Sequence, residues 1–456
     1  MDDKPVVQPD AAGVDIGARE IFTAVPNDPE GKPVRRFEVF TADLEQMACW
    51  MKACGVTTVA MESTGVYWIP LYEVLEKHGL QPCVVNPRHM RNVPGRRTDW
   101  HECQWIQYLH SMGLLRAAFR PADEICALRA VVRHRQRMIE TGSQQVQHMH
   151  KALTQMNLQI HHVISDITGV TGTAILRAIL AGQRDPHRLA ELRDARVKAS
   201  DEVLVKSLQG NWRAEYLFCL RQSFELYEAC LRQIDAATCA MERMMKALDD
   251  AVDAGHRPLP PDAKRRCRPK RKPLSVRTEP FHMRSVVYTK YGVDVTQIPG
   301  LDQNAVLLLS EVGRDMSRWK DASRFVAWLA LCPDNDISGG KVLWRGSRKH
   351  KTRAGQIFRM AAQSQHHSSS EMGDYYRRIR ARLGPQAATM ATARKIATIF
   401  YVTVPRQIEY DPQTAFPHQP DRHSRQLANL ARKARKLGVT IVVPDAGTVD
   451  SAQRGN

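Results

Sequence analysis

Short apolar segments that alternate with helical segments constrain the first 120 residues most strongly. AGVDIG and IFTAVPN predict the two strands of a hairpin, and VRRFEVF predicts a third strand. The β-branched runs VTTVAME and PCVVNP predict two more strands, with the helical pattern GVYWIPLYEVLEKHGL between them and WHECQWIQYLHSMGLL after them. A hairpin followed by strand–helix alternation predicts an α/β domain with a mixed sheet and helices on its faces.

Four acidic residues lie where such a fold brings side chains together, and the order of elements is compatible with an RNase H-like fold. Asp15 and Glu62 lie in or just after two predicted strands, and Asp99 and Glu102 open a predicted helix on one face. Carboxylates at strand ends bind hard divalent cations, and a pair of cations clamps the attacking and leaving oxygens of a phosphodiester. The quartet therefore predicts a site that cuts or joins nucleic acid.

Each acidic residue also has a structural interpretation. G-x-D-x-G on a first strand fits sugar kinases and many turns, and Asp99 with Glu102 three residues later fits a helix capping box. Two of the acidic residues lie at predicted strands and two at the start of a predicted helix. This order favours the functional interpretation for the set as a whole. The basic loop RHMRNVPGRR, which carries Arg96 and Arg97, leads directly into Asp99.

Composition supports a nucleic-acid partner. Lys and Arg outnumber Asp and Glu by 66 to 48 in 456 residues, an excess that favours binding to nucleic acid or to an anionic membrane. No apolar run approaches the ~20 residues needed to span a bilayer, so we expect no membrane association. The first ten residues lack a signal-peptide core, and the ten cysteines form no C-x-x-C motif. We therefore expect a cytoplasmic protein.

Residues 121–254 predict a long helical arm. Apolar residues recur at heptad-like spacing in a helix expected from Pro121 to about Ile164, and a second helical stretch covers roughly 212–250. Together they predict an antiparallel coiled coil, formed either within one chain or between protomers. We expect the Gly-punctuated segment between the two helices to pack at the tip of this arm.

Residues 255–289 predict a basic, Pro-rich linker. Seven of the nine residues from Lys264 to Lys272 are basic, and the prolines exclude a helix. The segment is either a solvated tether or an arm that binds phosphates, and the basic composition of the whole chain favours the arm. The candidate phosphate-binding residues are Lys264, Arg265, Arg266, Lys270, Arg271 and Lys272.

Residues 290–405 predict a mainly helical C-terminal domain, followed by a basic tail over 406–456. IPGLDQNAVLLLSEVG fits a helix-hairpin-helix-like element, in which Gly300 would let backbone amides point outward. Ser338 lies in the polar stretch DNDISGGK, followed by a basic run with Trp344 as a base-stacking candidate. The run suggests nucleic-acid contacts from Lys341, Trp344, Arg345, Arg348, Lys349, Lys351, Arg353 and Arg359.

Ser338 has two interpretations from the sequence alone. Its hydroxyl beside a phosphate-binding surface suits nucleophilic attack on phosphorus. Alternatively, Ser-Gly-Gly is a turn beside a solvated basic face.

Many ordered motifs over roughly residues 11–405 resemble the DEDD-type transposases of bacterial insertion sequences. They include GVDIG, AMESTGVYW, VVNPRHMRNVPGRRTDWHECQWIQ, SDITGVTG, LAGQRDP, IPGLD and FVAWLALCPDNDISGGK. These recombinases, guided by a bridge RNA, join an N-terminal RuvC-like domain to a C-terminal serine-bearing transposase domain. The resemblance implies that Asp15, Glu62 and Asp99 are acidic ligands, that Glu102 stands where the family usually has Asp, and that Ser338 is the nucleophile.

The resemblance also implies the reaction and its partners. Such enzymes excise their element as a circle and insert it elsewhere, through a covalent serine–DNA intermediate. A non-coding guide RNA pairs with donor and target DNA, and two Mg²⁺ ions assist cleavage. Domains of different protomers combine into composite active sites, so we expect a homo-oligomer, from dimer to tetramer.

Two other functions remain compatible with the residues. A RuvC-like, structure-specific DNA nuclease needs the carboxylates but no serine chemistry. A non-catalytic nucleic-acid-binding protein needs neither, and its acidic quartet would serve only as helix caps and solvated surface.

Overall fold

A computed structural model describes most of the chain in two compact units, Met1–Arg120 and Pro121–Asn456, and each unit is described by itself. Side chains of residues 336, 337, 342 and 344 lie outside the description. None of the described helices is long and apolar enough to cross a bilayer. The described residues are 6–63, 65–86, 98–253, 255–262, 283–302, 304–333, 335–344, 346, 352–417, 430–432, 434–435 and 437–439.

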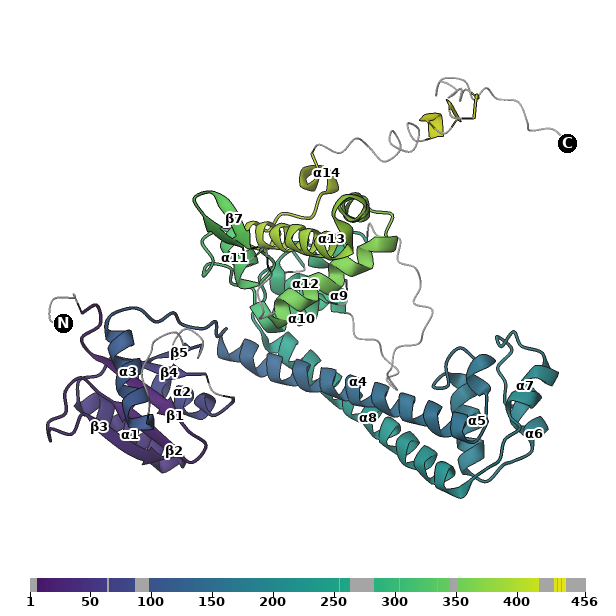
Figure 1. The fold of residues 1–456 in the computed structure, drawn as a ribbon, viewed down its shortest axis with the longest axis horizontal. Coiled ribbons are helices and arrows are strands. Elements are labelled where there is room, and N and C mark those ends of the chain that lie inside the picture. Colours follow the sequence, from purple (N-terminus) through teal and green to yellow (C-terminus); the bar gives the residue numbers. More distant parts are fainter. Residues whose placement is uncertain are drawn as a thin grey trace. The chain divides into compact units, whose positions relative to one another are not determined.

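The first unit is built on a five-stranded mixed sheet in the order β3-β2-β1-β4-β5 (Figure 1). β1 (Ala11–Ile16), β2 (Glu20–Ala24) and β3 (Val34–Glu38) form an antiparallel meander. The hairpin predicted from the first two apolar segments is therefore confirmed.

The other half of the sheet is parallel. β4 (Thr58–Glu62) pairs with β1, and β5 (Gln81–Val85) pairs with β4. Parallel neighbours need a crossover connection, and α1 (Thr41–Ala53) and α2 (Trp68–Lys77) lie in these connections. The result is the expected mixed sheet with helices, compatible with an RNase H-like domain.

Different helices cover the two faces of the sheet. α1 and α2 share a buried apolar cluster with one face, in which Val14 and Met61 contribute from the central strands. α3 (Asp99–Ser111) lies on the other face, directly against β1. Gly13 makes this approach possible, because a Cβ there would lie only 2.2 Å from the backbone nitrogen of Gln107. The glycine therefore sets how closely α3 rests on the strand that carries Asp15.

Two long helices dominate the second unit. α4 (Asp123–Gln155) and α8 (Ala214–Ala247) lie side by side and run in opposite directions (Figure 1). Nε of Arg135 on α4 donates a hydrogen bond of 2.8 Å to Oγ1 of Thr238 on α8. The pairing forms within one chain.

The first of these helices is shorter than the sequence predicts. It ends at Gln155 rather than near Ile164, and Asn157 then adopts φ 56°. Asparagine tolerates this left-handed conformation, which ends the helix. The apolar positions beyond Gln155 therefore continue the spacing of the seam but belong to a separate segment.

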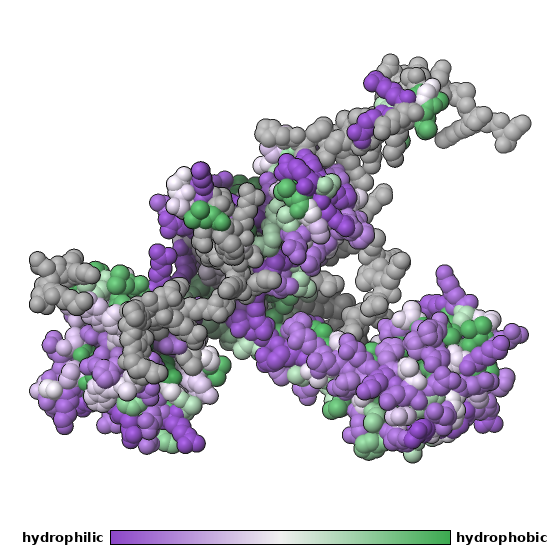
Figure 2. Space-filling model, viewed as in Figure 1, coloured by the Kyte–Doolittle hydropathy of each residue, from purple (hydrophilic) through white to green (hydrophobic). Residues whose placement is uncertain are grey.

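A small helical cluster caps the far end of this helix pair. α5 (Val170–Leu180), α6 (Pro186–Ala190) and α7 (Asp201–Ser207) share one buried core with the ends of α4 and α8. This agrees with the expectation that the Gly-punctuated segment packs at the tip. Figure 2 shows that the viewed surface of this region is largely hydrophilic.

The rest of the second unit is mainly helical. It contains α9 (Met283–Tyr291), α10 (Ala305–Val312), α11 (Ala322–Trp328), α12 (Arg353–Ser364) and α13 (Glu371–Arg406). An aromatic cluster joins α9, α11, α12 and α13 through the side chains of Tyr291, Phe325, Phe358 and Phe400.

Two further features shape this helical region. α13 is kinked where Gly384, with φ 85°, precedes Pro385. Nε and Nη2 of Arg133 on α4 donate to the two carboxylate oxygens of Glu311 on α10, at 2.8 and 2.7 Å. The helix pair is therefore fixed to the helical region at one end.

The turn around Gly300 lies against a neighbouring helix. A Cβ at Gly300 would lie 2.6 Å from the carbonyl oxygen of Ala361, so the turn packs tightly against α12. The amides of Ile298 and Leu301 donate to carbonyls of the same loop, those of Val295 and Ile298. The left-handed glycine therefore allows close packing against α12, and the helix-hairpin-helix-like element stays a prediction.

Candidate active site

Asp15 and Glu62 occupy neighbouring positions at the carboxyl ends of two parallel strands. Val14 on β1 pairs with Met61 on β4, and each acidic residue follows the paired residue of its strand. Paired positions on parallel strands direct their side chains to the same face of the sheet. Both carboxylates therefore belong to the face that α3 covers.

The first turn of α3 supplies the other two acidic residues. The contact at Gly13 places the backbone of Cys103 and Gln107 against β1, two residues before Asp15. Asp99 and Glu102 lie at the start of the same helix. The close packing of α3 thus brings its first turn toward Asp15.

Asp99 and Glu102 do not form a capping box in the structure. The N-cap residue is Thr98, and no side chain caps the helix. The Thr98 hydroxyl instead lies 2.7 Å from Nδ1 of His101. A helix-capping role therefore does not account for these carboxylates.

Electrostatic coupling links all four acidic residues. Partial burial, followed by the charges of Glu102, Asp99 and Glu62, raises the pKa of Asp15 from 3.8 to about 6. Burial and the nearby Asp15 carboxylate also raise the pKa of the Cys103 thiol to about 12. The first turn of α3 and the ends of β1 and β4 therefore form one region of concentrated negative charge.

This region suits a hard divalent cation in its chemistry. The four carboxylates supply oxygen ligands of negative charge, which is the ligand type that Mg²⁺ prefers. A cation would also offset the repulsion that raises the pKa of Asp15. Across the part of the chain that the structure describes, no three ligating side chains converge closely enough to hold a metal ion. The carboxylates are close enough to shift the pKa of Asp15, but they do not converge as a complete set of metal ligands among the described residues.

Ser338 lies at the tip of a β-hairpin in the second unit. It ends β6 (Asp336–Ser338), and it pairs across the turn with Lys341, the first residue of β7 (Lys341–Trp344). The turn residues Gly339 and Gly340 have φ values of 55° and 76°. Two positive φ values are typical of a type I′ turn, which favours glycine. The hairpin leaves Ser338 exposed to solvent.

This hairpin was not predicted from the sequence, although a signal for it was present. Two glycines between the short segments DIS and KVLW are a recognised two-residue hairpin pattern. Gly13 and its contact with α3 were also missed. No local pattern identifies a glycine that meets a helix some ninety residues later.

Only three of the predicted basic contact residues have described side chains. Lys341 and Arg353 are exposed, and Arg359 is buried on α12, where its guanidinium donates to the amide oxygen of Gln356. The other predicted contacts lie outside the described residues or, for Trp344, have no described side chain: Arg96, Arg97, Lys264, Arg265, Arg266, Lys270, Arg271, Lys272, Trp344, Arg345, Arg348, Lys349 and Lys351.

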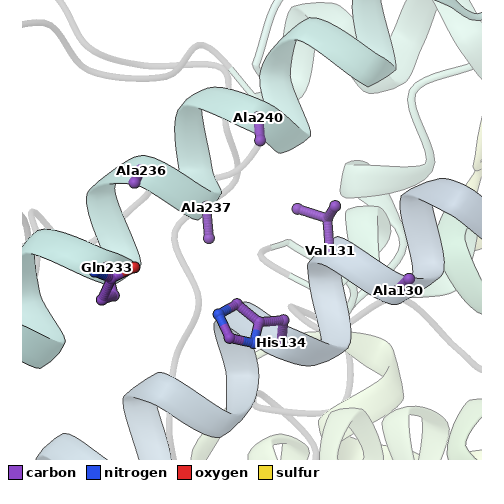
Figure 3. A pocket seen from close by; sticks show the side chains of 7 residues that line it. All are labelled: Ala130, Val131, His134, Gln233, Ala236, Ala237 and Ala240. Carbon is purple, nitrogen blue, oxygen red and sulfur yellow. The ribbon is translucent and has the colours of Figure 1, made fainter.

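One apolar groove lies between α4 and α8 (Figure 3). It has a volume of 410 Å³, and small side chains on both helices leave the space. Val131 and His134 line it from α4, and Ala237 and Ala240 line it from α8. None of the predicted site residues borders this groove, so it has no part in the predicted catalytic site.

Two transposase family models match the chain. Residues 12–158 match the DEDD transposase domain of IS110, and residues 294–377 match the transposase IS116/IS110/IS902 family. None of the curated proteins compared with the chain matches it significantly. The chain belongs to the IS110 family of transposases and is therefore a DNA transposase, an enzyme of DNA recombination. The DEDD-type domain also indicates dependence on a divalent metal.

Proposed function

We propose that this transposase uses Asp15, Glu62, Asp99 and Glu102 to hold two Mg²⁺ ions and Ser338 as the nucleophile. The observation that carries the proposal is the raised pKa of Asp15, caused in part by the other three carboxylates. Bound Mg²⁺ would neutralise phosphate charge and lower the pKa of an attacking hydroxyl. The acidic residues would orient the ions at the carboxyl ends of β1 and β4.

Ser338 would perform the covalent step. Its Oγ bonds to phosphorus while the bond from phosphorus to the leaving sugar oxygen breaks, and the proton lost by Oγ is matched by one gained at that oxygen. The exposed hairpin tip supports this role, because a nucleophile must reach a phosphate on a large substrate. Lys341, opposite Ser338, would place positive charge beside that phosphate.

We further propose that the site is composite and RNA-guided. In the sequence, 236 residues separate Ser338 from Glu102, and the two residues belong to different units. The resemblance to bacterial insertion-sequence enzymes supports a homo-oligomer, in which the α4–α8 pair acts as a coiled-coil arm that positions partner domains. A guide RNA would pair with donor and target DNA, and the basic surface of the protein would hold backbones.

The metal assignment is tested with Asp15→Asn. The substitution keeps size and removes one negative charge, so strand cleavage should be lost while nucleic-acid binding stays within about twofold of the unmodified protein. Asp43→Asn on α1, on the opposite side of the sheet, is the matched control and should cleave normally. Retained cleavage by Asp15→Asn would exclude the proposed role.

The nucleophile is tested by trapping a protein–DNA adduct under denaturing conditions. Ser338→Ala should form no adduct, whereas Ser364→Ala on α12 should form it normally, because Oγ of Ser364 donates to the carbonyl of Ala361 and accepts from Nε2 of Gln365, and neither contact belongs to the proposed site. Adduct formation by Ser338→Ala would contradict the proposal. Free DNA ends without attached protein would indicate a nuclease mechanism instead.

A further inference from the structure

Cationic side chains gather at the turn between α12 and α13. This turn contains a short 3₁₀ helix, η4 (Gln365–His367). Gly373 lets α13 approach it closely, since a Cβ there would lie 2.3 Å from the carbonyl oxygen of Ser368. Arg377 and Arg380 are three residues apart on α13 and therefore extend along the same side of the turn.

One of these arginines has a structural role. Arg377 donates to the carbonyl oxygens of His366 and Ser368, at 3.2 and 2.6 Å. It also pairs with the carboxylate of Asp374. These contacts fix α13 to the turn and neutralise the charge of Arg377.

The second arginine has no such partner. Arg380 contacts Nε2 of His366, and Nδ1 of His366 lies 3.0 Å from Nε2 of His367. In the part of the chain that the structure describes, Arg380 forms no ion pair, and Asp374 is engaged by Arg377. Partial burial, Arg380, His367 and Arg377 lower the pKa of His366. Arg380, His366 and His367, here called the Arg–His row, therefore bring nitrogen donors together without an opposing anion.

We propose that the Arg–His row binds a phosphate group of a nucleic-acid backbone, separately from the residues that perform the chemistry. A phosphate oxygen accepts hydrogen bonds from both guanidinium and imidazole groups, and such charge-assisted bonds are among the strongest in proteins. It would replace the present contact between Arg380 and Nε2 of His366.

A metal ion fits this row less well. Arg380 beside the histidines would repel a cation, and no three ligating side chains converge here among the residues described. DNA and RNA offer the same phosphodiester chemistry, so the test includes both. The proposal relies on the transposase binding nucleic acid and not on the roles of the acidic residues or Ser338.

The test compares Arg380→Ala with Arg382→Ala in full-length protein. Arg382 is exposed on the same helix, and it has no described ion pair or hydrogen bond. Its replacement by alanine removes the same charge as Arg380→Ala. Binding of a labelled DNA duplex and of a labelled single-stranded RNA is measured by fluorescence anisotropy over a range of KCl, with EDTA present to prevent cleavage. Arg380→Ala should reduce the salt dependence by about one phosphate contact, and affinity by about three- to tenfold, for at least one of the two probes.

The controls make the outcome decisive. Arg382→Ala should leave the salt dependence unchanged, and Arg380→Lys should recover most of the affinity. Equal effects of Arg380→Ala and Arg382→Ala, or no effect of either, would overturn the proposal. In an independent measurement, inorganic phosphate should shift the NMR signals of the His366 and His367 rings in the unmodified protein. If neither ring responds, the row does not bind phosphate, whatever the stability of the variants.

Discussion

Asp15 bears most of the electrostatic strain in the first unit. Its carboxylate is partly buried, and three other carboxylates act on it. One unit of pKa shift corresponds to about 1.4 kcal/mol, although partial exposure to solvent reduces the effect on stability. The residue that is central to the proposed metal site therefore destabilises the metal-free protein.

This strain predicts a pH-dependent effect of Asp15→Asn. Since the pKa of Asp15 is raised in the folded state, stability is lost as pH rises from about 4 through 6. In EDTA at pH 8, the variant should exceed the unmodified protein in stability by about 1 to 2 kcal/mol, and the difference should shrink toward pH 5. Thermal denaturation across this range measures it, with Asp43→Asn as the control. A difference independent of pH would contradict the prediction.

Glu102 is expected, from the resemblance, to stand in the fourth acidic position of the family. The resemblance places an aspartate here in most of the family, and glutamate keeps the charge while extending one methylene further. We expect Glu102→Asp to retain cleavage within about tenfold and Glu102→Gln to lose more than about a hundredfold. Single-turnover cleavage in Mg²⁺ measures both rates. Equal activity of the two variants would show that the charge at this position is not required.

At the scale of elements, substitutions in the turn of the β6–β7 hairpin test whether this turn positions Ser338. The positive φ values of both turn residues match a type I′ turn, in which asparagine is accepted first and glycine second. Gly339→Asn should therefore preserve adduct formation. Gly340→Val should lower it by about five- to tenfold, because a β-branched residue disfavours the left-handed conformation. Similar adduct yields from both variants would show that the turn does not position Ser338.

The elements differ in how well the sequence predicts them. The strands of the first unit could be predicted, because their apolar runs are bounded by turn residues and carry strong β propensity. The Ser338 hairpin could not be recognised by apolar periodicity, since each of its strands has four residues or fewer. The end of α4 depends on the left-handed conformation of Asn157, which asparagine tolerates but does not always adopt, so the apolar spacing beyond it predicts a longer helix. The closeness of α3 to β1 depends on a contact between residues far apart in the chain.

At the scale of the whole molecule, a composite site predicts complementation between inactive variants. Asp15→Asn retains an intact Ser338, and Ser338→Ala retains an intact acidic quartet. If protomers exchange these parts, a mixture of the two variants should recover part of the adduct formation that each lacks alone. Adduct yield is measured against each variant at the same total protein concentration. No recovery after co-expression would indicate that each chain completes its own site.

The antiparallel course of α4 and α8 has a consequence for how this protein tolerates changes in length. The chain leaves and returns at the same end, where Arg133 binds Glu311 and Lys290 binds Asp250. Deletion of eleven residues from each helix, about three turns, would shorten the pair by about 16 Å and leave both attachments in phase. The helix pair is in this sense a molecular ruler, whose span evolution or engineering can adjust without rebuilding the domain to which it is anchored.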